Sequence, residues 1–299
     1  MSGDTVSLFV NPMAGRGRAG RRLQRIKQLF AASSVPIRVI ESRSTGDLEN
    51  AVTEHVNAGA KRVVVAGGDG SIHEAVNGIL RADAGASLGI VPTGTGNDFA
   101  KSCGVPLAWE HATQLLVERL ASNAPTHAID IGRMNDRYFA NGAGIGFDAK
   151  VTRIAGSIRW PIGDFVYLLA ILRCLYDGIA TPELVIQSGD DVWRGPVTLV
   201  NISNGPWIGG MFHIAPMANN ADGILDLLLA KPVSRTRIFS LLPKLMQGRH
   251  MNEPEIIHQS VQKVTITSAI AIESHVDGEV QTPQTRFEIS VLPAALNLL

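Results

Sequence analysis

The stretch Gly67-Gly68-Asp69-Gly70 places one carboxylate among three glycines, after the apolar run 63–66 and before a helix pattern. Glycine allows positive φ and lets a phosphate approach the backbone amides, and the start of a helix adds further N–H donors. A carboxylate in such a loop repels phosphate unless it orients Mg²⁺ or hydrogen-bonds a sugar or water. The stretch therefore predicts nucleotide phosphate binding. The alternative is an ordinary strand–helix turn in which Asp69 caps the helix.

Two other apolar runs lead into glycine-rich loops in the same way. Residues 8–10 precede the loop 11–17, and residues 88–92 precede the loop 93–98. Parallel strands that are joined by right-handed crossovers bring their carboxyl ends to one edge of the sheet, where open α/β folds bind ligands. We therefore expect the three loops to converge on one site.

A competing nucleotide pattern begins at Gly15. Residues 15–20 fit G-x-G-x-x-G, and Glu41 stands where a dinucleotide fold places its ribose-binding acid. The match is weak, because arginines alternate with the glycines and the pattern comes late after its strand. The phosphate loop that ends in Gly-Lys-Ser or Gly-Lys-Thr is absent from the sequence.

The rhythm of the sequence changes near Asn123. Strand and helix patterns alternate before it, and short apolar or alternating runs, such as 261–267 and 287–292, follow it. We predict an α/β N-terminal domain with a parallel, Rossmann-like sheet over residues 1–125. Residues 126–299 are predicted to form a mainly β C-terminal sandwich, with the last residues either in it or back on the first domain.

Several stretches match, in order, the signatures of one enzyme family, and they cover nearly the whole chain: Asn11-Pro12 with Gly15, 67–71, Pro92 with 94–100, Asp130-Ile131-Gly132, 141–148, Ala215-Pro216, 221–226 and Asp277-Gly278-Glu279. On these stretches the chain resembles the diacylglycerol kinase catalytic domain, in the branch of bacterial soluble lipid kinases and sphingosine kinases. This resemblance implies a two-domain fold of the NAD kinase and diacylglycerol kinase type, with the active site in the cleft.

The resemblance also implies the nucleotide-binding residues. Asn97 and Asp98, with Asp69, are expected to shape the end of the site that holds nucleotide and catalytic metal. Asp98 has the alternative of a helix N-terminal carboxylate. His73 replaces the family's usual asparagine, and a surface position on a helix is its alternative. The residues carried over for ATP are Asn11, Pro12, Gly15, Gly67, Gly68, Asp69, Gly70, Ser71, Ile72, His73 and Thr95, with Ser42 or Thr45 as a further match.

Three acids are candidates for the chemical step besides Asp69. Glu279 is the leading proton acceptor and Asp277 its competitor, with Gly278 allowing a tight turn between them. A hairpin turn with solvated acids is the alternative. Asp130 matches a family acid that reaches the site from the second domain, and capping of a strand start is its alternative.

A second metal site is implied around Asp222. Its carboxylate is a suitable hard ligand, and the resemblance adds the backbone carbonyls of Asn219 and Ile224, with waters completing an octahedron. This Mg²⁺ would be structural or allosteric. Asp222-Gly223 is equally typical of a hairpin.

Two apolar segments are candidates for lipid contact. Residues 160–175 are too short to span a bilayer and are interrupted by Pro161, Asp164 and Arg173. They predict an acyl channel, an interfacial helix or a buried helix. The run 238–246, flanked by basic residues, predicts a peripheral contact with anionic lipid or a solvated helix face.

Composition limits the partners and the compartment. The 299 residues include 27 basic and 27 acidic side chains, so no net charge favours nucleic acid. The 45% hydrophobic content suffices for two cores. Cys103 and Cys174 lack metal-ligand spacing, and the first residues show no signal-peptide pattern. A cytoplasmic protein with peripheral membrane association is expected.

We therefore predict a lipid kinase that depends on ATP and Mg²⁺ and acts in phospholipid metabolism. It would transfer the γ-phosphate to a lipid hydroxyl, in the manner of a diacylglycerol kinase. The expected partners are a lipid with a free hydroxyl, a membrane surface and a second copy of the chain. The alternatives are a noncatalytic nucleotide- and lipid-binding regulator, a dinucleotide-dependent oxidoreductase and a dinucleotide kinase. Diacylglycerol, phosphatidylglycerol, a long-chain base and a polyprenol all fit the pattern of the acceptor.

Overall fold

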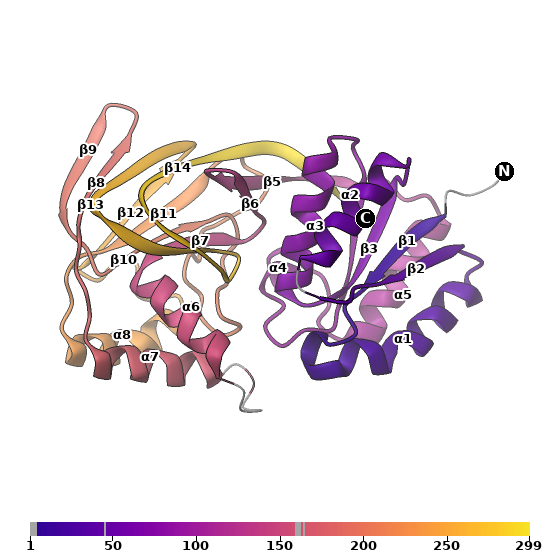
Figure 1. The fold of residues 1–299 in the computed structure, drawn as a ribbon, viewed down its shortest axis with the longest axis horizontal. Helices are drawn as coiled ribbons and strands as arrows, with labels where there is room; N and C mark the ends of the chain where they lie inside the picture. The colour runs from indigo at the N-terminus through magenta and orange to yellow at the C-terminus, as the bar shows by residue number, and fades with distance from the viewer. Residues whose placement is uncertain (1–4, 45, 159–162, 164) are drawn as a thin grey trace. The chain divides into compact units, whose positions relative to one another are not determined.

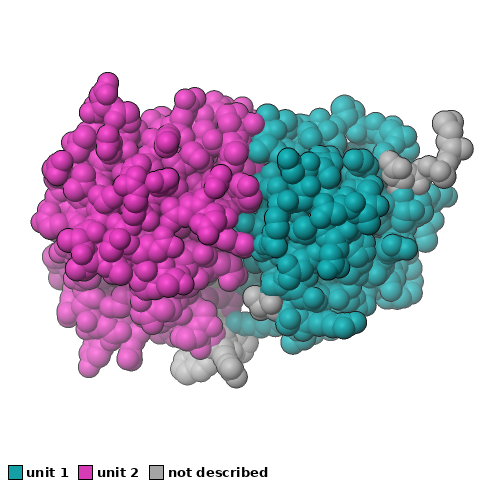
Figure 2. All heavy atoms as spheres, turned by 45° about the horizontal axis from the view of Figure 1, so that its top comes forward, with its two compact units in different colours: residues 1–130, 294–299 teal, residues 131–293 magenta. Residues whose placement is uncertain are grey.

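The chain forms two compact units, which Figure 2 distinguishes by colour. The computed structural model describes residues 5–44, 46–158, 163 and 165–299. Unit 1 contains the residues up to Asp130 together with Ala294–Leu299, and unit 2 is Ile131–Pro293. The units therefore divide five residues beyond the expected position, and the last residues of the chain belong to unit 1.

Unit 1 is built on the predicted parallel sheet. Its strands lie in the order β4, β3, β1 and β2, and the end of β14 pairs parallel with β4. The residues of β1 are all buried, as are residues 63–67 of β3 and 88–92 of β4, because helices cover both faces of such a sheet. The strands are β1 (Val6–Val10), β2 (Ile37–Glu41), β3 (Arg62–Gly67) and β4 (Ser87–Pro92).

Helices lie on both faces of the sheet of unit 1. Figure 1 shows α1 and α5 on one face and α2 and α3 on the other. Apolar residues of α1, such as Ile26 and Phe30, share a core with Leu116 of α5 and Leu8 of β1. The helices are α1 (Ala14–Ala32), α2 (Asp47–Asn57), α3 (Asp69–Ala82), α4 (Asp98–Ser102) and α5 (Trp109–Ala121).

Unit 2 is mainly β, as predicted. Its central strands are antiparallel in the order β12, β11, β10, β7, β13 and β14, and β8 joins β13 to β9. The strands enclose one apolar core that includes Ile145, Ile202, Leu227 and Phe287. The strands are β5 (His127–Met134), which begins in unit 1, β6 (Arg137–Phe139), β7 (Gly142–Gly146), β8 (Glu183–Ser188), β9 (Asp191–Pro196), β10 (Leu199–Ser203), β11 (Leu225–Ala230), β12 (Ile256–Val261), β13 (Lys263–Val276) and β14 (Glu279–Leu298).

Two strands of unit 2 are longer than the sequence pattern predicts. The expected runs 261–267 and 287–292 fall mostly inside β13 and β14, which pair with one another from the Asp277-Gly278 turn onward. The register between the two strands shifts between Thr267 and Ile272 and again before Ser274. Such irregularities bend a strand and break its alternation, and therefore the pattern shows only the regular parts.

Three helices lie beside the strands of unit 2: α6 (Phe147–Ser157), α7 (Phe165–Asp177) and α8 (Arg235–Met246). They share a second apolar cluster, which includes Val151, Ile171 and Leu242. The patterns at 160–175 and 238–246 predict α7 and α8, whereas α6 is a helix that the β pattern of this half does not predict. Pro161 and Asp164 lie outside the described residues.

Candidate active site

The three glycine-rich loops of unit 1 meet at the carboxyl ends of β1, β3 and β4, as predicted. A Cβ atom at Gly15 would lie 2.1 Å from the carbonyl oxygen of Thr93, and one at Gly94 would lie 2.4 Å from Gly68 Cα. The amides of Thr93 and Gly94 both donate to the carbonyl of Gly67, at 2.9 and 3.2 Å. The loops therefore touch backbone to backbone, and only glycine permits this approach.

The first loop is shaped by backbone in the left-handed region. Gly15, Arg16 and Gly17 have φ of 58°, 61° and 81° at the start of α1. The Asn11 Oδ1 atom accepts a hydrogen bond from the Met13 amide at 3.0 Å, which closes a turn after β1. Gly15 thus meets two requirements, a positive φ and contact with Thr93, that a side chain would oppose.

Asp69 links two of the loops. It is the first residue of α3, yet its Oδ1 atom accepts from the Phe99 amide of α4 at 3.2 Å. The N-cap residue of α3 is Gly68, which has no side chain that could cap the helix. Asp69 thus caps α4 of the neighbouring loop. Its carboxylate lies next to the Asp98–Phe99 peptide.

The third loop is held by Asn97, whose φ is 52°. Its side-chain oxygen accepts from the Gly94 amide at 3.0 Å, and its Nδ2 atom donates to the Gly94 carbonyl at 3.2 Å. Asp98 stands in the first turn of α4 and forms an ion pair with Lys101 at 3.0 Å. Thr95 is exposed, while the Thr93 hydroxyl is buried without a hydrogen-bond partner in the described part of the chain.

The remaining nucleotide candidates differ in what they can offer a ligand. Ser71 and Ile72 are buried in α3, and the Ile72 amide already donates to the Gly68 carbonyl at 3.0 Å. Ser42 follows β2, and its amide bonds to Val10 of the neighbouring strand at 2.9 Å. Thr45 lies outside the described residues.

His73 does not lie on a helix surface. The side chain is only 2% exposed, and its Nε2 atom is 3.5 Å from Asn77 Nδ2 one turn further along α3. The alternative of a surface histidine is therefore wrong. His73 lies on the face of α3 that packs inside unit 1.

The acidic turn of unit 2 separates its two carboxylates. Asp277 and Gly278, with φ of 49° and 87°, form a two-residue hairpin turn between the paired residues Val276 and Glu279. Asp277 accepts from the amides of Ala140, Asn141 and Gly142 at 2.8, 2.9 and 3.0 Å. Its carboxylate thus holds the hairpin against the connection between β6 and β7. It is not a solvated acid.

Glu279 is in the opposite situation. It begins β14 and is exposed, and its carboxylate has no hydrogen bond or ion pair within the part of the chain that the structure describes. Of the two carboxylates in this turn, Glu279 is therefore the one with lone pairs open to a ligand.

Asp130 has a structural contact within unit 1. It is 3% exposed, and its Oδ1 atom accepts from the amide of Ala294 at 2.8 Å. Ala294 begins the part of β14 that belongs to unit 1 and has a φ of 51°. Asp130 therefore fastens the returning end of the chain. It lies in the middle of β5 and not at the start of that strand.

The loop around Asp222 is an exposed turn. Asp222 Oδ1 accepts from the Ile224 amide, and Asn219 Oδ1 accepts from the Ala221 amide, each at 3.2 Å. Gly223, between Asp222 and Ile224, has a φ of 76°. Among the described residues, no group of three or more His, Cys, Asp or Glu side chains could hold a metal ion. The ligand set implied here contains a single carboxylate.

An apolar pocket lies inside unit 2, between its helices and the strands β10 and β11. The pocket has a volume of about 110 Å³ and is lined by residues of α6, α7 and α8 that include Val151, Ile171 and Leu242. Asp148, in the first turn of α6, is one of the few polar residues that line it. The mainly apolar lining suits a hydrocarbon chain.

The sequence pattern assigned no role to Asp148 and His275, two residues beside the Asp277-Gly278 turn. The Nε2 atom of His275 lies 3.1 Å from Asp148 Oδ2, and its Nδ1 atom accepts from the Gly278 amide at 3.3 Å. The available signal was local, since His275 stands two residues before Asp277 and Asp148 ends the stretch 141–148.

Known proteins resemble this chain over its whole length. The model of the diacylglycerol kinase catalytic domain matches residues 5–134, and the model of the YegS C-terminal NAD kinase beta sandwich-like domain matches residues 142–299. The diacylglycerol kinase of Mycobacterium tuberculosis is 30% identical over 98% of this chain and 94% of its own. The diacylglycerol kinase of Bacillus subtilis is 27% identical over 91% and 88%.

Solved structures share the fold. The structure of a diacylglycerol kinase from Bacillus anthracis has a TM-score of 0.76 at 24% identity, with 100% of this chain and 97% of that chain covered. A second solved chain from the same bacterium has a TM-score of 0.82 at 25% identity, with 99% and 97% covered. These likenesses cover both units and confirm the predicted fold class. The two family models together match residues 5–134 and 142–299, and a diacylglycerol kinase at 30% identity is matched over nearly the whole of both chains. This chain therefore belongs to the diacylglycerol kinase catalytic-domain family and is a lipid kinase.

Proposed function

We propose that this kinase transfers the γ-phosphate of ATP to the hydroxyl group of a lipid, and that its acceptor is of the diacylglycerol class. The apolar pocket of unit 2 carries this proposal, because it offers an acceptor about 110 Å³ of hydrocarbon-lined space in the unit that also contains Glu279. The relatives named diacylglycerol kinase support the choice of acceptor. None of the matches supports a noncatalytic regulator or an oxidoreductase.

The loops of unit 1 are suited to the phosphates of ATP. The N-terminus of α3 follows Gly68, and the amides of its first residues are the donors that an α-helix leaves without intrahelical partners. The glycines at 15, 68 and 94 let the three loops meet backbone to backbone, which brings the loops together beside this helix start. Phosphate binding at this place would use backbone and dipole before any charged side chain.

The same loops have the donors that Mg²⁺ prefers. Asp69 bonds to the amide of Phe99, so its carboxylate and that of Asp98 belong to one loop cluster. Carboxylate oxygens are hard ligands, and Mg²⁺ is usually held by one or two of them together with phosphate oxygens and water. These residues therefore fit a Mg²⁺ that neutralises the phosphates. The Asp222 loop fits less well, because it supplies one exposed carboxylate that already accepts from Ile224.

The proton of the lipid hydroxyl needs an acceptor, and we assign this role to Glu279. Its carboxylate is exposed, whereas three backbone amides occupy that of Asp277. Asp277 holds the turn on which Glu279 stands. In this assignment Glu279 is the base, and Asp277 supports the turn that positions it.

A change inside the pocket is expected to alter the choice of acyl chain. Ile171→Trp adds bulk on the pocket wall, whereas Leu172→Trp changes the neighbouring, exposed position of α7. We expect Ile171→Trp to raise the KM for dioleoylglycerol by about 10-fold, roughly the loss of two buried methylene groups. The KM for ATP should stay constant, and kinetics with dioleoyl- and dioctanoylglycerol will measure the effect. Equal changes in both variants would place the acyl chains elsewhere.

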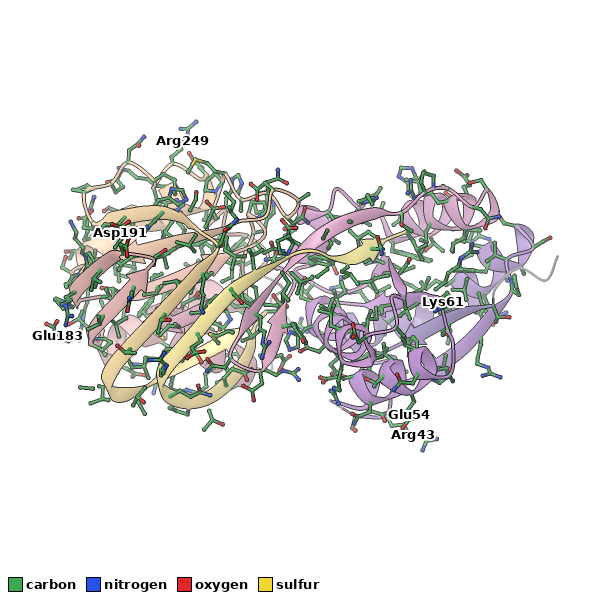
Figure 3. The ribbon with its side chains drawn as sticks, turned by 90° about the horizontal axis from the view of Figure 1, so that it is seen from above. Arg43, Glu54, Lys61, Glu183, Asp191 and Arg249 are labelled. Atoms are coloured by element: carbon green, nitrogen blue, oxygen red, sulfur yellow. The ribbon has the colours of Figure 1, made fainter. Side chains whose placement is uncertain are left out.

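We further propose that the exposed surface of α7 and α8 contacts the membrane. Tyr176 and Phe165 of α7 are 80% and 63% exposed, and Phe239 of α8 is 50% exposed. The charge of this surface differs from the sequence expectation, because Arg237 forms ion pairs with Glu253 and Glu255. Arg249 projects away from unit 2 (Figure 3). Among the described residues, no helix is long and apolar enough to cross a membrane.

Vesicle binding tests this surface. Phe239→Ser should weaken binding to phosphatidylglycerol-containing vesicles by about 10-fold, the scale of one lost apolar side chain at the interface. Val192→Ser, at an exposed apolar position of β9, is the matched control and should bind as the wild type does. Sedimentation with vesicles at low and high salt separates the apolar part of the binding from the electrostatic part. Unchanged binding of the α8 variant would remove this surface from membrane contact.

The proposed reaction is tested by transfer of labelled γ-phosphate from ATP to a mixed lipid extract, with and without Mg²⁺. A labelled lipid that comigrates with phosphatidic acid supports the assignment. Labelling of another lipid would support the lipid kinase reaction but show that the acceptor is not diacylglycerol. If nucleotide binds but no lipid is labelled, the proposed acceptor class is wrong.

A further inference from the structure

A buried imidazole stands beside the turn that holds Glu279. Resting on the proposed function, we propose that His275 is a positioning residue, which holds the amide of Gly278 and thereby orients the start of β14, where Glu279 stands. The residue lies on β13 and is 1% exposed. The role assigned here to Asp148 is to hold the other side of the ring.

The space for this ring comes from a glycine on the neighbouring strand. His275 is paired with Gly144 of β7 across the sheet. A Cβ atom at Gly144 would lie 2.4 Å from His275 Nε2 and 2.3 Å from Asp148 Oδ2. The missing side chain at this position therefore lets the imidazole of β13 reach the carboxylate on α6.

The two ring nitrogens have different partners. Nδ1 accepts from the Gly278 amide at 3.3 Å, so in the neutral ring the proton is on Nε2. Nε2 lies 3.1 Å from Asp148 Oδ2, although the pair is not aligned as a hydrogen bond and Nε2 has no such partner in the described part of the chain. A carboxylate at this distance favours the tautomer that leaves Nδ1 free to accept.

The turn is thus held at both of its residues. The carboxylate of Asp277 binds three amides of the β6–β7 connection, and His275 binds the amide of Gly278. Both turn residues have positive φ, a conformation that needs support at Asp277. Asp148 also lines the apolar pocket, so one chain of contacts joins the wall of that pocket to the turn before Glu279.

Two conservative substitutions separate the two ring contacts. In His275→Asn the side-chain oxygen takes the place of Nδ1 and can still accept from Gly278. In His275→Gln the amide reaches toward Asp148 but has no acceptor beside Gly278. His258→Gln is the matched control, because His258 pairs with Asp226 at 2.6 Å in the same unit, away from the turn. Each variant is measured for thermal stability, for steady-state kinetics and for hydrogen exchange at the Gly278 amide.

We expect His275→Gln to lower kcat by about 10-fold, because small misplacements of a reacting group are costly, and to leave both KM values within about 2-fold. The Gly278 amide should exchange about 10-fold faster in this variant. His275→Asn should have a kcat within about 3-fold of the wild-type value. The control variant, His258→Gln, should have the wild-type kcat.

Three results would overturn the proposal. The first is a wild-type kcat in His275→Gln. The second is equal loss of activity in the Asn and Gln variants, in proportion to the loss of folded protein, which would indicate packing alone. The third is unchanged exchange at Gly278, a readout that needs no activity. A wild-type enzyme that labels no lipid would instead overturn the proposed function, while the exchange measurement would still decide the contact.

Discussion

Glu279→Gln is expected to lower kcat by about 10²-fold or more, the scale of a lost general base. Glutamine keeps the size of the side chain but cannot take the proton of the lipid hydroxyl. Because Glu279 is exposed and has no partner in the described structure, the substitution should leave the fold intact. Binding of Mg-ATP should stay within about 2-fold. Lipid phosphorylation and nucleotide titration, run in parallel, measure the two quantities.

Asp277→Asn provides the contrast. The three amides bound by Asp277 would face a side chain with one acceptor oxygen fewer, and the free energy of unfolding should fall by roughly 2–4 kcal/mol. Loss of activity in this variant should therefore follow its lowered Tm, whereas Glu279→Gln should lose activity at an unchanged Tm. Wild-type turnover in Glu279→Gln would remove Glu279 as the proton acceptor.

Asp69→Ala is expected to weaken Mg-ATP binding by about 10-fold and to lower turnover by roughly 10²-fold, because it removes a proposed oxygen donor for the metal beside the phosphates. The substitution also removes the cap of α4, since Asp69 accepts from the Phe99 amide at 3.2 Å. Loss of such a cap costs about 1 kcal/mol of stability. Calorimetric titration and thermal unfolding measure the two effects.

Asp69→Asn separates the charge from the cap. Asparagine keeps an oxygen that can accept from Phe99, so the Tm should stay near that of the wild type. Mg-ATP binding and turnover should nevertheless fall nearly as far as in the alanine variant. If Asp69→Asn binds Mg-ATP as tightly as the wild type does, the role of Asp69 is limited to capping α4.

Much of unit 1 could be predicted because its signals are local. The apolar run 63–66 indicates a buried strand, and the glycines that follow it indicate a loop with close backbone approach. The rule that parallel strands end at one edge then brings three loops together, and the structure confirms this at Gly15, Gly68 and Gly94. Unit 2 was harder to predict, because the register between β13 and β14 shifts and the sequence pattern shows only part of each strand.

The sequence alone determined the family, the alternation of strands and helices in unit 1 and the set of chemically capable residues, since these depend on residue types and short spacings. Only the tertiary structure decided what each residue touches. Asp69 caps a helix that begins 29 residues later, Asp277 binds amides near 140, and His275 reaches Asp148 through the space at Gly144. Contacts between distant segments depend on packing and register. A pattern along the chain therefore could not separate the fastened Asp277 from the open Glu279.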